Sequence, residues 1–557
     1  MSYYFNRKEQ TLKEHKVLSH ESAKNSLSLN KDTKINLAYE CIDKHAQGKS
    51  KYKKALICIS KNNTVELTFN ELKNYTDQFA TFLLKNGLNK GEKVLLWMPR
   101  IAELYIALMG IIKAGGVPVP LSEFLSSRLV LEILEKTPWE KAYMVTTHDF
   151  LSTLSNLPEK YKIVVINRAD DFPDTSILSF KIMEDYAVDK DSVNGANFSD
   201  ELIVHYALDN FKNPRTMTYK QNQIMLMRHF GELIFNNIRE EDVFWSTVDL
   251  GWAAGTLYGI FTPWIFGATI VSADTTSTLS SWEKTIEKYK VNIMYTTPAM
   301  IRKIITKNIT KTGNLKTLRH ICCTGEPMGA EIIKWVLKNL RIPINSSWFA
   351  EEIGVPAISS TFTSPLRLGC MGKPLPGIEA AVFDDKGNQL KPYQIGKLGI
   401  RCSFENHTYD ENSTAEKTSW VLTDCLAYID NEGCFWYEGK EESLKKSISK
   451  ADNLNESQLE AHLLKHPAVE EAGIIVKSRE EGEKAVKVFI SLKDRNQWST
   501  ELERELTNYL QKKLKNETTK IEIEIRDKLP MTKSGKILRN ILSAWDRESS
   551  LRRVNNF

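Results

Sequence analysis

Cysteine is scarce in this chain, and its scarcity limits the classes of protein to consider. Eight cysteines are scattered over 557 residues, and no pair has the Cys-x-x-Cys spacing. This excludes a disulfide scaffold. Cys322 and Cys323 are adjacent in an apolar run, which predicts a buried strand, with a redox pair as the alternative. His462 and His466 have zinc-like spacing, but Pro467 ends the helix there, so no zinc site is expected at these histidines.

The chain also lacks a strong charge of either sign. Its 75 Lys and Arg residues nearly balance 70 Asp and Glu residues, which gives a net charge of +5. No electrostatic footprint for nucleic acid follows from this balance. The basic stretches at 51–54 and 552–553 are expected to be solvated faces, so a nucleic-acid partner is not predicted.

Only one long uncharged run is present. The run at 251–273 is long enough to span a bilayer, but its four glycines and one proline divide it. The glycines and the proline predict a buried helix followed by a buried strand, so no membrane association is expected. The polar first residues lack a signal-peptide core, and a cytoplasmic, reducing compartment is the expectation.

Helical and strand-like segments alternate after a polar leader at 1–34. Spacing predicts helices at 69–84 and 103–113, and strands at 92–98, 291–295 and 319–323. This alternation indicates a layered α/β domain over 35–439. A polar, charged stretch at 440–456 predicts a linker. The unit at 457–557 is predicted to contain helices at 457–465 and 500–514, strands at 471–476 and 486–492, and a basic tail.

Eight runs in one order carry a family resemblance: INLAYECIDKHA (35–46), MPRIAELY (98–105), GTLYGIFTPW (255–264), LRH (318–320), GEP (325–327), GKPLPGIEAA (372–381), HPAV (466–469) and LPMTKSGK (529–536). They resemble bacterial acetyl-CoA synthetases of the adenylate-forming (AMP-binding) ligase family. The resemblance implies an α/β fold with a large N-terminal domain of layered sheets and helices and a small mobile α+β C-terminal domain. It also implies ATP or AMP, Mg²⁺ and coenzyme A as cofactors or substrates, and a carboxylate that becomes an acyl-adenylate.

The segment that corresponds to the family's phosphate loop departs from the family pattern. The family has a glycine- and hydroxyl-rich loop after a buried strand, whereas residues 207–216 read ALDNFKNPRT. Glycines permit close approach of backbone N–H groups to phosphate oxygens. Here Asp209 adds negative charge, and Arg215 takes the place of the family's lysine. The loss predicts weak ATP binding; the alternative is that the loop moves aside and other groups compensate.

The magnesium and phosphate motif is altered as well. Residues 348–354 read WFAEEIG, in which Glu352 matches the family's catalytic and magnesium carboxylate. Glu351 replaces a hydroxyl donor with an acceptor-only carboxylate that repels phosphate, unless it faces solvent.

The adenosine side is better preserved. By the resemblance, Gly325, Glu326 and Pro327 pack on the adenine, and Asp424 accepts the ribose hydroxyls. Lys440 replaces an arginine, which keeps the charge but loses the bidentate fork. These residues are predicted to bind nucleotide, with retention for packing alone as the alternative.

Two more positions complete the expected chemistry. Lys536 matches the family's adenylation lysine, which stabilises developing negative charge; an exposed tail lysine is the alternative. The segment at 440–456 lacks the glycines, arginine and proline that the family uses for thioester formation.

The acyl pocket is expected at Trp252, Ala253, Ala254 and Phe349. Acetate enzymes of the family have tryptophan at the position of Phe349, so this pocket should admit propionate-sized or longer acids. Two hypotheses follow for function. The chain is an acetyl-CoA or short-chain acyl-CoA synthetase with weak or lost activity, or it is a non-catalytic paralogue that binds nucleotide or acyl-adenylate and regulates or partners a true synthetase.

Overall fold

The computed structural model describes most of the chain from residue 36 onwards. The described residues are 36–60, 63–139, 141–155, 157–166, 177–179, 196–207, 215–273, 275–306, 315–360, 369–402, 420–440, 456–478, 484–494, 498–514, 520–529, 537 and 542. They divide into two compact units, one of 1–379 with 401–421 and the other of 380–400 with 422–557. This division groups residues on both sides of 440–456 in the second unit, and the linker there remains a prediction.

The described part of the first unit contains two large sheets. Five parallel strands have the order β4–β3–β5–β6–β7, and β8 pairs antiparallel with β9. The other large sheet has the order β16–β15–β14–β13–β12–β10–β11–β1–β2, with parallel strands from β14 to β1. The strands are β1 (Lys54–Ile59), β2 (Thr64–Thr68), β3 (Lys93–Trp97), β4 (Val117–Pro120), β5 (Ala142–Thr147), β6 (Tyr161–Ile166), β7 (Ile177–Ser179), β8 (Glu201–Ala207), β9 (Arg215–Lys220), β10 (Val243–Ser246), β11 (Thr269–Ala273), β12 (Ile293–Thr296), β13 (His320–Cys323), β14 (Ile344–Ala350), β15 (Val355–Ser359) and β16 (Lys373–Pro374).

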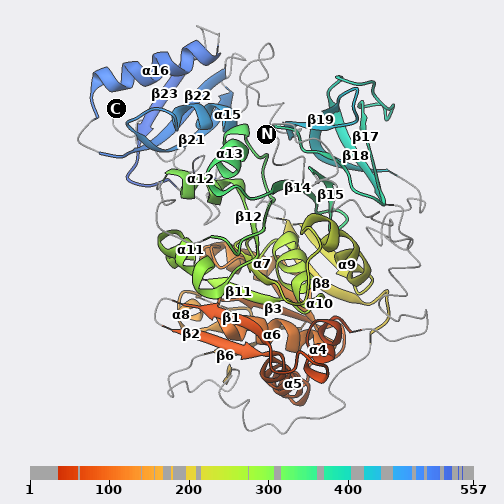
Figure 1. Cartoon of the computed structure of the whole chain (residues 1–557). Helices are drawn as coiled ribbons and strands as arrows, with labels where there is room; N and C mark the ends of the chain where they lie inside the picture. The colour runs from red at the N-terminus through yellow and green to blue at the C-terminus, as the bar shows by residue number, and fades with distance from the viewer. Residues whose placement is uncertain are drawn as a thin grey trace. The chain divides into compact units, whose positions relative to one another are not determined.

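Helices cover both faces of the larger sheet. Apolar side chains of α11, α12 and α13 pack on one face, while the end of α9 bonds to the other, where His320 and Asn345 reach the Ile234 carbonyl (Figure 1). The described helices, π-helical turns (η) included, are η1 (Tyr39–Asp43), α4 (Lys44–Gln47), α5 (Phe69–Lys85), α6 (Ala102–Lys113), α7 (Ser127–Lys136), α8 (His148–Leu151), α9 (Gln223–Ile234), η3 (Ala254–Phe261), α10 (Thr262–Ile265), α11 (Thr275–Tyr289), α12 (Pro298–Thr306), α13 (Ala330–Trp335) and η4 (Val336–Leu340). Two buried faces explain why the central strands are apolar throughout.

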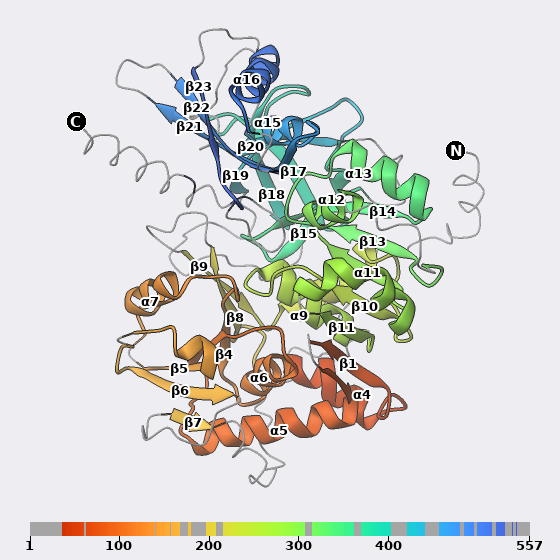
Figure 2. The ribbon, with the colours of Figure 1, turned by 90° about the vertical axis from the view of Figure 1, so that its left-hand side faces the viewer.

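The longest of these helices shows how local sequence starts an element. Thr68 accepts the Glu71 N–H, and Glu71 in turn accepts the Thr68 N–H, so a capping box begins α5. α5 starts at the end of the β1–β2 hairpin and from there runs beside α6 (Figure 2). The helices predicted at 69–84 and 103–113 are confirmed.

The second unit has two smaller sheets among its described residues. One has the order β17–β18–β19–β20, and the other the order β21–β22–β23, on which α15 and α16 pack. Their bounds are β17 (Ile378–Phe383), β18 (Gly396–Cys402), β19 (Val421–Ile429), β20 (Phe435–Lys440), α15 (Glu456–Leu463), β21 (Val469–Ser478), β22 (Lys484–Leu492), α16 (Thr500–Leu514) and β23 (Lys520–Ile525). Both predicted helices and both predicted strands are confirmed, whereas β23 lies where the sequence predicts only a basic tail. Lys440, placed at the start of the linker, is the last residue of β20.

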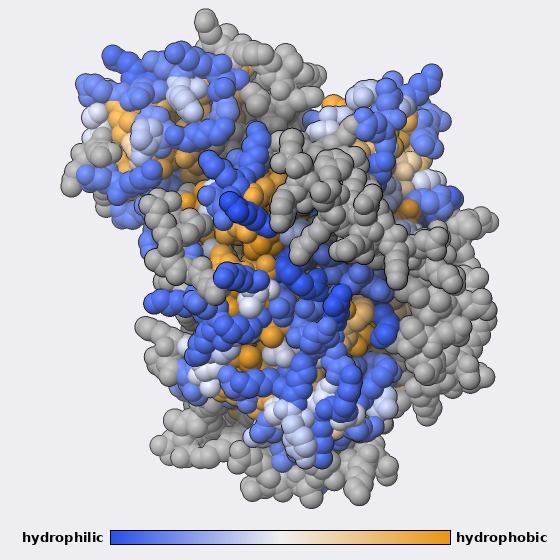
Figure 3. All heavy atoms as spheres, in the orientation of Figure 1, coloured by the Kyte–Doolittle hydropathy of each residue, from blue (hydrophilic) through white to orange (hydrophobic). Residues whose placement is uncertain are grey.

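The uncharged run at 251–273 forms η3, α10 and β11, which confirms the predicted helix and strand. No described helix is both long and apolar enough to cross a bilayer. Hydrophilic residues cover most of the described surface visible in Figure 3. Cys322 and Cys323 are buried in β13, as predicted. All eight cysteines lie in described residues and none forms a disulfide.

Candidate functional site

Three segments of predicted site residues follow neighbouring parallel strands. The turn at 251–255 comes after β10, the loop at 325–327 after β13, and the turn at 351–354 after β14; these strands pair in the order β10–β12–β13–β14. Carboxyl ends of parallel strands meet at one edge, where ligands of α/β sheets bind. The structure therefore brings these segments to one edge of the sheet.

Trp252 and Gly325 are in contact at this edge. Gly325 has a φ of +93°, and a Cβ there would lie 3.0 Å from the Trp252 ring and 3.9 Å from Thr297. Glycine is thus needed both for the backbone conformation and for the close approach of the indole. Beside it, Glu326 pairs with Arg302 at 2.6 Å, and Pro327 is exposed. The GEP segment is therefore a fixed, accessible loop against the Trp252 ring.

The turn after β10 is held by Asp249. Its carboxylate accepts the Ser122 hydroxyl at 2.6 Å and the Gly251 N–H at 2.8 Å. A Cβ on Gly255 would lie 1.9 Å from the Asp249 carbonyl oxygen, so the tight turn requires glycine at that position. The predicted pocket residues Ala253 and Ala254 follow within this turn and are buried.

His205 ties the strand before the phosphate loop to the same turn. Its Nδ1 lies 3.1 Å from the Gly251 carbonyl oxygen, and its Nε2 lies 2.8 Å from the Thr256 hydroxyl. A carbonyl only accepts, so Nδ1 carries the proton and Nε2 accepts from Thr256. Burial lowers the pKa of His205 to about 4, so the ring is neutral at physiological pH.

The turn after β14 is held from the β8–β9 hairpin and α9. The Tyr219 hydroxyl donates to the Glu351 carbonyl at 2.7 Å, and Gln223 Nε2 donates to the Ile353 carbonyl at 3.1 Å. Gly354 has a φ of +65° and lies directly against the Tyr219 ring. The β8–β9 hairpin is thereby joined both to the predicted acyl segment and to the predicted magnesium segment.

The two carboxylates of this turn are accessible. Glu351 is exposed and Glu352 is half-buried. Among the described residues, no three His, Cys, Asp or Glu side chains gather around a point that could hold a metal. Mg²⁺ commonly binds through one or two carboxylates together with phosphate oxygens and waters, and the accessible Glu352 fits that mode.

Phe349, which was predicted to line the acyl pocket, contacts Tyr258. The two rings meet edge to face with centroids 5.8 Å apart. Tyr258 lies in η3, four residues after Ala254. Contacts therefore pair Trp252 with Gly325 and Phe349 with Tyr258, on segments that begin at the same edge.

In the second unit, Asp424 and Lys440 are brought together. Lys440 Nζ lies 2.8 Å from Asp424 Oδ2, on the paired strands β19 and β20. The Asp424 side chain is 48% exposed and the Lys440 side chain 38% exposed, so both groups remain accessible to a ligand. The lysine that replaces arginine thus directs its charge to the predicted ribose carboxylate.

The side chains of two predicted residues fall outside the described part of the chain. Lys536 lies outside the described residues, and of Arg215 the backbone alone is described, at the start of β9. The residue after Lys536 is anchored, because Ile537 packs with Leu542 and Phe489 in an apolar cluster. A Cβ on Gly473 would lie 3.1 Å from Ile537. The adenylation role of Lys536 remains a prediction.

Several residues of the site were not predicted from the sequence: Asp249, His205, Tyr219, Gln223 and Tyr258. Each acts by a contact with a residue outside its own motif. A polar residue inside an apolar strand, as with His205, is the one signal that the sequence offered.

Comparison with known proteins defines the class. A family model described as "AMP-binding enzyme" matches residues 42–201 and 215–404, and one described as "AMP-binding enzyme C-terminal domain" matches 458–536. The chain therefore belongs to the AMP-binding, adenylate-forming acyl-CoA synthetase family. It is 31% identical over 525 residues to an acetyl-coenzyme A synthetase of Bacillus subtilis, covering 92% of this chain and 91% of the relative. An acetyl-coenzyme A synthetase of Rubrobacter xylanophilus is 26% identical over 550 residues, covering 91% and 84%.

Solved structures share the fold. An anthranilate CoA ligase, AuaEII, in complex with anthranoyl-AMP matches with a TM-score of 0.76 and 22% identity, over 93% of this chain and 98% of the other. A Brucella canis acyl-CoA synthetase matches with a TM-score of 0.71 and 23% identity, over 96% and 98%. The predicted fold class, a large N-terminal and a small C-terminal α/β domain, is confirmed.

The family match has one gap within its large domain. It stops at residue 201 and resumes at 215. The gap includes residues 207–214, which belong to the segment that departs from the family's phosphate-loop pattern. The sequence on both sides of the gap matches the family.

Proposed function

We propose that this protein binds an adenosine nucleotide and a short-chain carboxylate at the family's site, and that it forms acyl-adenylate slowly or not at all. Acetyl-CoA synthetase-like proteins join a carboxylate to the α-phosphate of ATP, release pyrophosphate, and then transfer the acyl group to coenzyme A. We propose that the substrates still bind but that the reaction steps that follow binding are slow or absent.

The observation that carries the proposal is the gap at 202–214 beside an ordered acyl and adenine edge. Trp252 and Gly325, which we propose to line the nucleotide side of the site, contact each other. Asp249 holds the turn at 251–255, which we propose to line the acyl pocket. In contrast, the phosphate segment has no glycine between 207 and 216. Each charge-assisted hydrogen bond lost to a phosphate weakens binding by about 1.5–3 kcal/mol.

Individual residues would have distinct roles. Asp424 would accept the ribose hydroxyls, with Lys440 beside it, and Glu352 would hold Mg²⁺ with phosphate oxygens. Bound Mg²⁺ would neutralise phosphate charge. Lys536 would stabilise charge on the carboxylate and α-phosphate during attack. Glu351 stands where the family has a hydroxyl. Its carboxylate is exposed in the free protein, as the solvent-facing alternative allows, but it is adjacent to Glu352 and would repel phosphates bound there.

ATP–pyrophosphate exchange with acetate, propionate and butyrate tests the proposal. We expect negligible exchange at millimolar ATP, and a measurable rise in the Glu351→Thr variant, which restores a hydroxyl donor. An active acetyl-CoA synthetase in the same assay is the positive control. Robust exchange by the unaltered protein would show that the phosphate site functions.

A regulatory role is the second candidate, favoured by the altered hinge. Residues 440–456 lack the glycines, arginine and proline that the family uses for the coenzyme A half-reaction. A protein that binds nucleotide without that segment could act on an intact synthetase. Copurification of the tagged chain with an intact synthetase from its own cells would support this role, and recovery of the chain alone under the same conditions would count against it.

We further propose a cytoplasmic location. All eight cysteines are free and seven of them are buried, as expected for a protein folded in a reducing compartment. Fractionation of cells with an antibody to the protein tests this, and recovery from an oxidising compartment would contradict it.

A further inference from the structure

Tyr258 is fully buried, yet its hydroxyl has no hydrogen-bond partner among the described residues. Burial raises the pKa of Tyr258 well above its usual value, so the hydroxyl keeps its proton and is a donor. Native proteins rarely leave a buried hydroxyl unsatisfied, and such a group generally indicates a bound water or a ligand.

The position of Tyr258 connects it to the acyl pocket. Its ring meets Phe349 at 5.8 Å and an interplanar angle of 74°. It also lies four residues after Ala254 in η3, a π-helix in which each N–H bonds to the carbonyl five residues back. Ala254 and Tyr258 are therefore about one turn apart on one side of η3, with Phe349 against that side.

A second hydroxyl supports a polar end to this pocket. Ser347 precedes Phe349 by two residues in β14, and the pairing of β14 with β15 shifts register between Trp348 and Phe349. Its Oγ is also buried without a hydrogen-bond partner among the described residues. The strand that bears Phe349 thus carries one unsatisfied hydroxyl, and Tyr258, which contacts Phe349, carries another. A purely apolar acyl chain would leave both hydroxyls unpaired.

We propose that the pocket takes a short carboxylic acid whose chain carries an oxygen, a hydroxy or oxo acid, and that the Tyr258 hydroxyl donates a hydrogen bond to that oxygen. This rests on the proposed function, because the carboxylate must first bind at the family's site. A site built to bond a polar group discriminates against the analogue that lacks it, since its own buried group is then left unpaired.

Binding of unreactive adenylates tests the proposal without requiring turnover. Calorimetry on the full chain would compare the sulfamoyl-adenosine analogues of 3-hydroxybutyrate, 3-oxobutyrate and butyrate. We expect at least one oxygen-bearing analogue to bind about five- to tenfold more tightly than the butyrate analogue, and Tyr258→Phe to abolish that preference. Equal or tighter binding of the butyrate analogue, or a preference that survives Tyr258→Phe, would overturn the proposal.

The stability of the free protein provides a matched control. Tyr105 is also fully buried, but its hydroxyl donates to Ser272 at 2.7 Å. We expect Tyr105→Phe to lower Tm and Tyr258→Phe to leave Tm unchanged or raised. A loss in Tm for Tyr258→Phe equal to that for Tyr105→Phe would show that the free protein satisfies the hydroxyl, against the proposal. Binding of no adenylate at all would refute the proposed function as well, whereas equal binding of all three would refute this inference alone.

Discussion

Gly325 combines a constrained backbone with a place in the proposed nucleotide site. Alanine at a φ of +93° is strained, and its Cβ would press on the Trp252 ring at 3.0 Å. We expect Gly325→Ala to displace the indole, shift its fluorescence and weaken AMP binding by about tenfold, or 1.4 kcal/mol. Calorimetric titration of the variant and of the unaltered protein with AMP measures the change in affinity.

Gly91 provides the control for strain alone. It has a φ of +82°, but a Cβ there meets nothing within 4 Å. Gly91→Ala should therefore lower stability by about 1 kcal/mol while leaving AMP binding unchanged. Equal AMP affinity in Gly325→Ala and the unaltered protein would show that the Trp252 contact is not part of the nucleotide site.

Buried histidines predict a pH dependence of stability. Burial lowers the pKa of His205 and of His320 to about 4, whereas an unfolded histidine titrates near 6.5. Below pH 6.5 the unfolded chain binds more protons than the folded one, so stability is present above pH 6.5 and falls as pH drops towards 4. The slope is about 1.4 kcal/mol per pH unit for each histidine.

Urea unfolding between pH 6.5 and 5 measures this slope, and the His205→Gln variant should show a shallower one. A slope that the variant does not change would mean that folding does not lower the pKa of His205. The family motifs supplied candidate site residues, which remain predictions. They could not predict the bond from His205 to Gly251, because that contact joins positions 46 residues apart.

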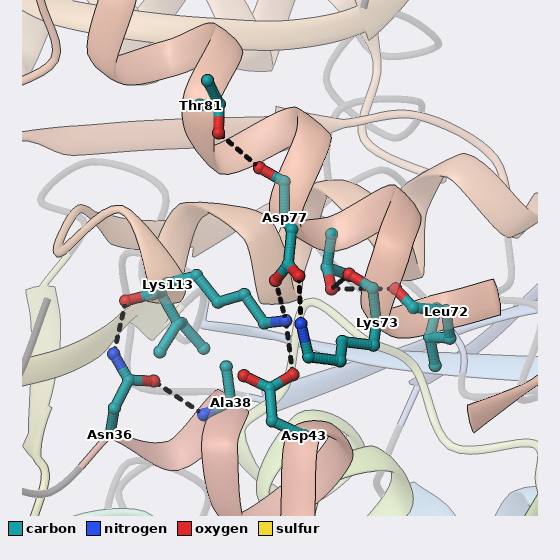
Figure 4. A network of polar contacts seen from close by, with 10 residues as sticks. Asn36, Ala38, Asp43, Leu72, Lys73, Asp77, Thr81 and Lys113 are labelled. Carbon is teal, nitrogen blue, oxygen red and sulfur yellow. Dashed lines mark hydrogen bonds and ion pairs between the residues drawn. The ribbon is translucent and has the colours of Figure 1, made fainter. Parts of the chain in front are cut away.

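At the scale of elements, a buried lysine joins three helices. Lys113 of α6 is fully buried and its ammonium pairs with Asp43 of η1 and Asp77 of α5, while Lys73 also reaches Asp77 (Figure 4). Burial raises the pKa of Asp43, and Lys113 opposes that rise. The network compensates charges that would otherwise be costly at this helix contact.

Removing Lys113 should therefore be severe. Lys113→Met leaves two buried carboxylates without their shared cation, and we expect a loss of about 3–5 kcal/mol in unfolding free energy by urea denaturation. Lys136→Ala is the matched control, because its 2.6 Å pair with Glu132 joins two exposed side chains, 44% and 39% accessible to solvent. The control should lose at most about 0.5 kcal/mol. Similar small losses in both variants would refute the role given to the network.

Strand and helix prediction succeeded where burial imposes a simple pattern. The strands near 291–295 and 319–323 are buried on both faces and were predicted from their apolar runs. β23 was missed although Ile521, Ile523 and Ile525 alternate with glutamates, because it follows a charged helix and the five residues before Lys520 are polar. The π-helical winding of η3 has no sequence pattern that distinguishes it from an α-helix.

At the scale of the whole molecule, the departures from the family concern the phosphates and the hinge. The match to the large-domain family model stops at residue 201 and continues from 215. The match to the C-terminal-domain model begins at 458, after the altered segment at 440–456. The residues that the family resemblance assigns to adenosine, Asp424 and Gly325, each have a defined contact within their own unit. A nucleotide should thus gain its binding free energy from adenosine more than from its outer phosphates.

The relative affinity for AMP and ATP tests this asymmetry most directly. Calorimetric titration of the full chain with AMP and with ATP in excess Mg²⁺ gives both dissociation constants on one preparation. We predict that AMP binds at least as tightly as ATP, because the β- and γ-phosphates find few donors and meet Glu351. Binding of ATP tenfold or more tightly than AMP, or binding of neither, would contradict the account.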